Sequence, residues 1–116
     1  MIRPDPLDVP FLPVTGEIYR IRTVIVQPPD QHDTRPVVVV SSPRDLMGRV
    51  ALVCRTSDTS AKGIAHSRDR RLGLTKDGVF DRLRSTEAQL WTPRNVARLG
   101  LLDAATLSEV VERFWT

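Results

Sequence analysis

The chain contains a single cysteine, Cys54, and few aromatic residues, which make up 5% of its 116 residues. One cysteine excludes an intramolecular disulfide, and its position after the apolar run VALV predicts a buried structural thiol rather than a nucleophile. A chain without disulfides suits a reducing compartment, so we expect a cytoplasmic protein. No apolar run approaches the ~20 residues that cross a membrane, and no membrane association is predicted.

The common catalytic motifs are also missing. The sequence has no P-loop, no dinucleotide fingerprint and no Cys/His cluster with metal-ligand spacing, and its two histidines, His32 and His66, are far apart in predicted loops. If the protein is an enzyme, we expect it to work without a metal or a cofactor. The net charge of +3 is compatible with a polyanionic partner without requiring one.

Prolines crowd the N-terminus, at positions 4, 6, 10 and 13. They fix the backbone and remove hydrogen-bond donors, so residues 1–15 are predicted to form an extended or poorly ordered segment. This segment also lacks the continuous apolar region of a signal peptide. The remaining residues, 16–116, are predicted to form one domain with a modest core.

Three strands are predicted in the first half of the chain, at residues 16–26, 35–42 and 49–57, on their content of Ile, Val and Thr. The second contains four consecutive valines, is apolar on both faces and is expected at the centre of a sheet. Prolines and aspartates make residues 27–34 a loop. Residues 42–48 are predicted to form a single helical turn.

The second half is less regular until its end. Residues 58–78 are polar and basic, and we expect an irregular excursion with at most a short strand. One or two further strands are predicted within 79–91. A short helix is predicted over 92–100, with Thr92 as its cap and Gly100 at its end.

The clearest helix signal is at the C-terminus. Asp103 is predicted to cap this helix, and Leu102 and Leu107 occupy the two positions of a hydrophobic staple. One apolar face follows, formed by Leu107, Val110, Val111 and Phe114. Strands first and helices last predict a mainly β fold, a small β-barrel with the C-terminal helix packed on it.

Arg35 stands out because it places a permanent charge at the mouth of the valine-rich strand. The following proline biases it to an extended backbone, and a rigid strand is where a positioned cation belongs. If the second and third strands pair antiparallel, Thr56 and Ser57 lie near Arg35, and together they make a plausible phosphate or oxyanion site. The alternative is a solvated surface arginine that discourages aggregation.

Several segments match, in order, motifs of one known family. GEIYRI is similar to an opening GD(I/V)Y strand, RPVVVVSS to an RPV(V/L)VVS strand, and VALVCRTS to a strand ending in ITS or ITG. KDGV and EAQLWTPRNV look like KDSVV…QIRT(I/V)D…RL, and LGLLDAATLSEVVERF is similar to the closing helix. Together these segments, over residues 16–114, resemble the MazF/PemK family of toxin endoribonucleases from type II toxin–antitoxin systems.

The resemblance implies an SH3-like barrel with short helices, a homodimer, and metal-independent, sequence-specific cleavage of single-stranded RNA. Two catalytic residues carry over by motif, Arg35 and Thr56. In the family's scheme the RNA's own 2′-OH attacks the adjacent phosphate, giving a 2′,3′-cyclic phosphate and a 5′-OH. Arg35 would stabilise the phosphorane and assist proton transfer, and Thr56 would hydrogen-bond the phosphate.

The loop 27–34 is predicted to cover the RNA groove and help select bases. RNA contacts are expected from Gln31, His32, Asp33, Thr34 and Ser57. Arg55 stands where the family has an apolar residue. By strand alternation it is expected to face away from Thr56, onto a dimer or partner surface. Trp91 replaces an arginine of the family motif and is expected to pack in the core.

The resemblance also implies a cognate antitoxin, a segment that is disordered alone and orders over the RNA groove. Two alternatives stay open, because a barrel does not fix a function. One is a non-nuclease module that acts on a protein target, as toxins that poison DNA gyrase do on this fold. The other is a degenerate homologue that only binds an antitoxin.

Overall fold

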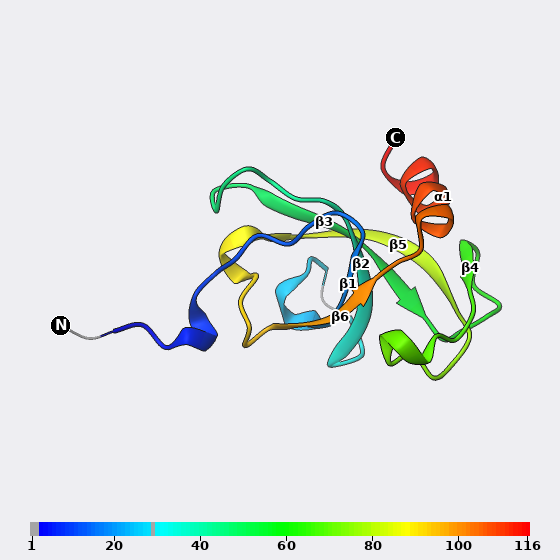
Figure 1. The fold of residues 1–116 in the computed structure, drawn as a ribbon, viewed down its shortest axis with the longest axis horizontal. Coiled ribbons are helices and arrows are strands. Elements are labelled where there is room, and N and C mark those ends of the chain that lie inside the picture. The colour runs from blue at the N-terminus through cyan, green and yellow to red at the C-terminus, as the bar shows by residue number, and fades with distance from the viewer. Residues whose placement is uncertain (1–2, 29) are drawn as a thin grey trace.

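Six strands form one antiparallel sheet in the computed structural model, which describes residues 3–28 and 30–116 (Figure 1). The strands are β1 (Glu17–Arg22), β2 (Thr34–Ser41), β3 (Arg49–Thr56), β4 (Ile64–His66), β5 (Gly78–Glu87) and β6 (Val96–Leu101). They lie in the order β4-β5-β3-β2-β1-β6, and the sheet curls into a half-barrel. The α-helix α1 (Ala104–Phe114) follows the last strand. The predicted mainly β fold with a C-terminal helix is confirmed.

The sheet is buried on both faces, because alternate residues of its central strands enter two separate apolar cores. Val37 and Val39 of β2 belong to the core that contains Tyr19 and Trp91. Val38 and Val40 belong to the core on the opposite face. The run of four valines is therefore a central strand, as predicted, since each valine has an apolar cluster to enter.

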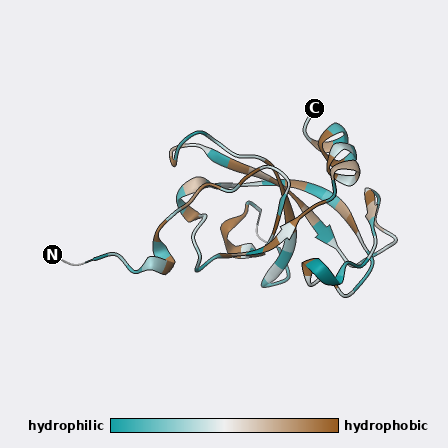
Figure 2. Cartoon of the chain, in the orientation of Figure 1, coloured by the Kyte–Doolittle hydropathy of each residue, from teal (hydrophilic) through white to brown (hydrophobic). Residues whose placement is uncertain are grey.

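The helix α1 covers the second of these cores, beside β4 and β5 (Figure 1). Asp103 caps it through a hydrogen bond of 2.9 Å from the backbone N–H of Thr106. Val110 is fully buried. The other members of the predicted apolar face pack on the same core: Leu107, Val111 and Phe114. The helix carries brown and teal residues in Figure 2, as an amphipathic helix should.

Two predicted elements are wrong in the first half of the chain. The first strand ends at Arg22 rather than at residue 26, because the chain turns into the 3-10 helix η2 (Thr23–Ile25) and buries Ile25 in the first core. The predicted helical turn over 42–48 is a non-helical turn. Asp45 organises it by accepting a hydrogen bond of 2.9 Å from the backbone N–H of Met47.

The short helix predicted over 92–100 is also wrong. After one turn at Thr92, the chain enters β6, which pairs antiparallel with β1. The local helix signals, a threonine cap with proline at the start and a glycine at the end, are outweighed because the backbone N–H and C=O groups of this segment pair with those of β1. The excursion over 58–78 contains the short strand β4, as predicted, and also the 3-10 helix η3 (Arg70–Leu72), which was not predicted. The strand β5 is followed by the 3-10 helix η4 (Ala88–Leu90).

The proline-rich N-terminal segment begins away from the sheet, at one end of the molecule, and reaches the body of the protein after its exposed residues 3–9 (Figure 1). Its 3-10 helix η1 (Pro6–Asp8) is held by Arg94, which pairs with Asp5 at 3.1 Å and Asp8 at 2.6 Å. The backbone N–H of Phe11 donates to the carbonyl of Trp91 at 3.1 Å. Residues 1 and 2, and Pro29 of the predicted loop, lie outside the described residues. None of the described helices is long and apolar enough to span a membrane.

Candidate active site

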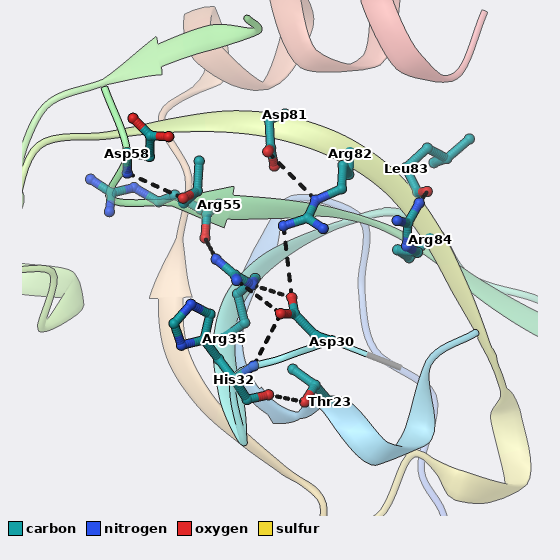
Figure 3. A network of polar contacts seen from close by, with 11 residues as sticks. Thr23, Asp30, His32, Arg35, Arg55, Asp58, Asp81, Arg82, Leu83 and Arg84 are labelled. Atoms are coloured by element: carbon teal, nitrogen blue, oxygen red, sulfur yellow. Dashed lines mark hydrogen bonds and ion pairs between the residues drawn. The ribbon is translucent and has the colours of Figure 1, made fainter. Parts of the chain in front are cut away.

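Arg35 lies at the start of β2 and is buried, with 7% of its surface exposed. Asp30 faces it with both carboxylate oxygens: Nε of the arginine lies 2.5 Å from Oδ2, and Nη2 lies 3.1 Å from Oδ1 (Figure 3). Nη1 donates to the backbone carbonyl of Arg55 at 3.3 Å. The guanidinium is therefore held in one orientation by a two-point ion pair and a carbonyl.

Asp30 belongs to this candidate site but was not predicted from the sequence. Its hydrogen bonds with Arg35 hold the pKa of the carboxyl well below its usual range, and the same contact raises the pKa of Arg35. The backbone N–H of His32 donates to Asp30 at 3.1 Å, and the guanidinium of Arg82 from β5 lies 3.8 Å away (Figure 3). A single aspartate in a polar loop has no periodic pattern that would reveal this pairing.

Thr56 ends β3, the strand that neighbours β2. The two strands pair antiparallel with Val37 opposite Cys54, which confirms the predicted pairing and brings the end of β3 to the start of β2. The hydroxyl of Thr56 accepts a hydrogen bond of 3.1 Å from the backbone N–H of Asp58. In this arrangement it organises the turn after the strand, and its contact with a phosphate stays a prediction.

A cavity of about 220 Å³ opens beside Arg35 at this end of the sheet. Four of the predicted site residues line it: His32, Thr34, Arg35 and Ser57. Gln31 and Asp33 are exposed on the same loop but do not line this cavity, and Thr56 does not line it either. The loop and the two strand ends thus meet around one hollow, and the RNA contacts expected from them stay predictions.

Arg55 was predicted to face a dimer or partner surface, and this prediction is wrong. Arg55 is only 4% exposed, because β4 and the segment before β5 fold over it. Its Nε donates to Nδ1 of His66 at 2.9 Å, and its Nη2 donates to the carbonyls of His66 at 2.9 Å and Lys76 at 2.7 Å. A Cβ on Gly78 would lie 2.6 Å from Nη1 of Arg55, so the glycine makes room for this guanidinium.

Burial sets the ionisation of this second arginine and its histidine partner. Desolvation lowers the pKa of Arg55, and desolvation together with the neighbouring Arg55 charge lowers the pKa of His66. The imidazole is therefore neutral near pH 7, which leaves Nδ1 free to accept from the arginine. Arg55, like Arg35, is built into the fold rather than extended into solvent.

The chain matches no protein-family model and no curated protein sequence. Among solved structures it is similar to a MazE–MazF crystal structure from Deinococcus radiodurans (Form-II), with a TM-score of 0.62 and 21% identity over 89% of this chain and 91% of that one. Form-III of the same complex gives a TM-score of 0.60 and 20% identity over 89% of this chain and 92% of that one. The fold is MazF-like.

Within this MazF-like fold, the electrostatics of the strand ends favour anions. Basic side chains from three strands and one loop line the cavity: Arg20, Arg35, Arg55 and Lys76. No Asp or Glu lines it among the residues that the structure describes. The hydroxyls of Thr34, Ser57 and Thr75 add neutral donors. Cations and hydroxyls without a lining carboxylate are what a phosphate group binds.

Proposed function

We propose that this protein is the toxin of a toxin–antitoxin system and a metal-independent, sequence-specific endoribonuclease that cleaves single-stranded RNA. One observation supports the proposal above the others. A buried arginine, held by two-point pairing at the start of the central strand, borders a cavity lined by basic side chains and hydroxyls on a MazF-like sheet. Such a constellation is suited to stabilising charge on a phosphate in the transition state.

The proposed reaction needs no external nucleophile. The 2′-oxygen of the RNA forms a bond to the adjacent phosphorus and loses its proton, while the bond from phosphorus to the 5′-oxygen breaks and that oxygen gains a proton. The products are a 2′,3′-cyclic phosphate and a 5′-OH end. Arg35 stabilises the charge on the phosphorane and assists proton transfer, and Thr56 donates a hydrogen bond to a phosphate oxygen.

Asp30 gives this mechanism an additional step. Its two oxygens bind the same Nε and Nη2 donors that a phosphate would use in a bidentate contact. RNA binding therefore exchanges the carboxylate for a phosphate, with the Arg82 guanidinium, 3.8 Å away, remaining beside the displaced Asp30.

The similar solved structures are MazE–MazF complexes, which supports a cognate antitoxin protein as a partner. We propose that a segment of this antitoxin, disordered alone, orders over the RNA groove and blocks it. A homodimer of the toxin completes the assembly.

The test is to incubate the purified protein with a long single-stranded RNA in EDTA and to map the cleaved ends. We expect cuts at a short recurring motif, 5′-OH and 2′,3′-cyclic phosphate ends, and no cut where a single 2′-deoxynucleotide replaces the nucleotide that supplies the attacking 2′-OH. Intact RNA with folded, antitoxin-free protein would overturn the proposal.

One observation favours a second candidate, a non-nuclease module that acts on a protein target. All three nitrogens of the Arg35 guanidinium already have acceptors within the chain, as in a purely structural ion pair. This candidate predicts that induction of the protein in cells leaves RNA intact and causes DNA damage, as a gyrase poison would.

A further inference from the structure

Arg55 carries a buried positive charge that has no ion-pair partner among the residues that the structure describes. Its hydrogen bonds go to two carbonyls and a neutral imidazole, and no carboxylate of the described residues lies within ion-pair distance. Arg35, in contrast, has Asp30. The nearby Asp77 accepts instead from the backbone N–H of Arg68 at 2.9 Å. A buried charge without a counter-charge is costly, so its presence here points to an anion that binds from outside the chain.

The cavity offers a place for that anion. Arg55 lines it, and its Nη1 donates to no acceptor among the described residues. The exposed side chains of Arg20 and Lys76 line the same cavity, and their flexible stems can bring both charges onto a ligand. The volume of about 220 Å³ is far above the ~10–15 Å³ that one water requires.

We propose that the part of this cavity around Arg55 is a second phosphate subsite, in which Arg55, Arg20 and Lys76 bind an RNA backbone phosphate next to the one at Arg35. The inference rests on the proposed function. Continuity with the active site favours RNA over an acidic peptide, because Arg35 lines the cavity and its Nη1 lies 3.3 Å from the Arg55 carbonyl. One RNA strand can therefore present successive phosphates to Arg35 and Arg55. The subsite fixes the register of the RNA and leaves bond cleavage to Arg35.

The test uses binding rather than cleavage. A fluorescent single-stranded oligodeoxynucleotide lacks the 2′-OH and stays intact, so its dissociation constant can be measured across a series of KCl concentrations. Each phosphate contact contributes about 0.7 to the slope of log affinity against log salt. We expect Arg20→Gln and Lys76→Gln each to weaken binding and to lower this slope by about 0.7. Arg44→Gln is the matched control, because Arg44 is exposed in the turn that joins the end of β2 to the start of β3, away from the cavity. This variant should leave the slope unchanged.

Arg55 needs a separate measurement because it also holds the chain together. Inorganic phosphate is expected to raise the melting temperature of the wild-type protein. Arg55→Met is expected to show a smaller rise, because only the phosphate site at Arg35 remains, even if its own melting temperature falls. A phosphate-dependent rise of wild-type size in Arg55→Met would overturn the assignment of Arg55. Unchanged salt slopes for Arg20→Gln and Lys76→Gln would overturn the subsite.

The outcomes separate this proposal from the nuclease itself. If the wild-type protein cleaves RNA but the pocket variants, Arg20→Gln and Lys76→Gln, bind the oligonucleotide as tightly as the wild type, the subsite is overturned and the nuclease is not. If no RNA is cleaved and the pocket variants still lower the slope, the nuclease fails and the phosphate subsite stands. If a glutamate-rich peptide binds through Arg20 and Lys76 and the oligonucleotide does not, the cavity is a protein site and the proposal is overturned.

Discussion

One substitution, Asp30→Asn, tests how much the pair between Asp30 and Arg35 contributes to the free energy of unfolding. Both side chains are 9% exposed, and the carboxylate meets the guanidinium at two points. Asp30→Asn removes the negative charge and leaves the buried Arg35 uncompensated, a change that costs about 3–5 kcal/mol when a buried pair is broken from one side. We expect about 3 kcal/mol, the lower end, because Arg35 also borders an open cavity.

The assay is urea unfolding at pH 7, followed by far-UV circular dichroism. With a slope of about 2 kcal/mol per M, the expected loss lowers the midpoint by about 1.5 M. Asp33→Asn is the matched control, since this aspartate is exposed on the same loop, and its free energy of unfolding should change by at most ~0.5 kcal/mol. An Asp30→Asn midpoint equal to that of the wild type would refute the account of a buried, two-point pair.

The same pair also predicts a dependence on pH. The pKa of Asp30 is depressed in the folded protein, so its stabilising contribution is complete above about pH 4, the ordinary pKa of an aspartate. The contribution declines as the pH falls from there toward the depressed pKa of the folded state. The gap in midpoint between the wild type and Asp30→Asn should therefore be full at pH 7 and narrower at pH 3.

Three further predictions concern the cores and the helix. Trp91→Ala removes a fully buried side chain that packs edge-on against Tyr19, with ring centroids 4.9 Å apart, and should cost about 3–5 kcal/mol in urea unfolding. A cost below about 1 kcal/mol would mean that Trp91 is not a core residue. Asp103→Ala removes the cap on Thr106 and should cost about 1 kcal/mol, seen as a melting temperature lower by about 4 °C; an unchanged temperature would count against the cap. Burial raises the pKa of Cys54 to about 11, so iodoacetamide at pH 8 should alkylate it only after unfolding, and rapid labelling of the folded protein would contradict that burial.

The sequence predicted best where one signal dominated. The four valines of β2 had to be buried on both faces, and the face of α1 combined periodicity with a cap at Asp103. The helix predicted over 92–100 was wrong because its local helix signals are weaker than the hydrogen bonds that this segment makes with β1 as strand β6.

Only part of the candidate site could be predicted from the sequence, for a related reason. Arg35 was found from its position before a buried strand, and the antiparallel pairing of β2 and β3 followed from their short connection. Asp30 and the burial of Arg55 could not be predicted, because both depend on how a loop and the excursion before β5 fold back over the strand ends. Contacts of this kind join residues that share no local pattern.

The central claim is that Arg35 stabilises the transition state of RNA cleavage, and single-turnover cleavage rates test it directly. Asp30→Asn is the control that separates chemistry from folding, since it disrupts the same pair but keeps the guanidinium. With folding of each variant verified, Arg35→Ala should lose ~10²–10³ in rate, while Asp30→Asn retains most of it. Cleavage by Arg35→Ala at the wild-type rate would contradict the claim.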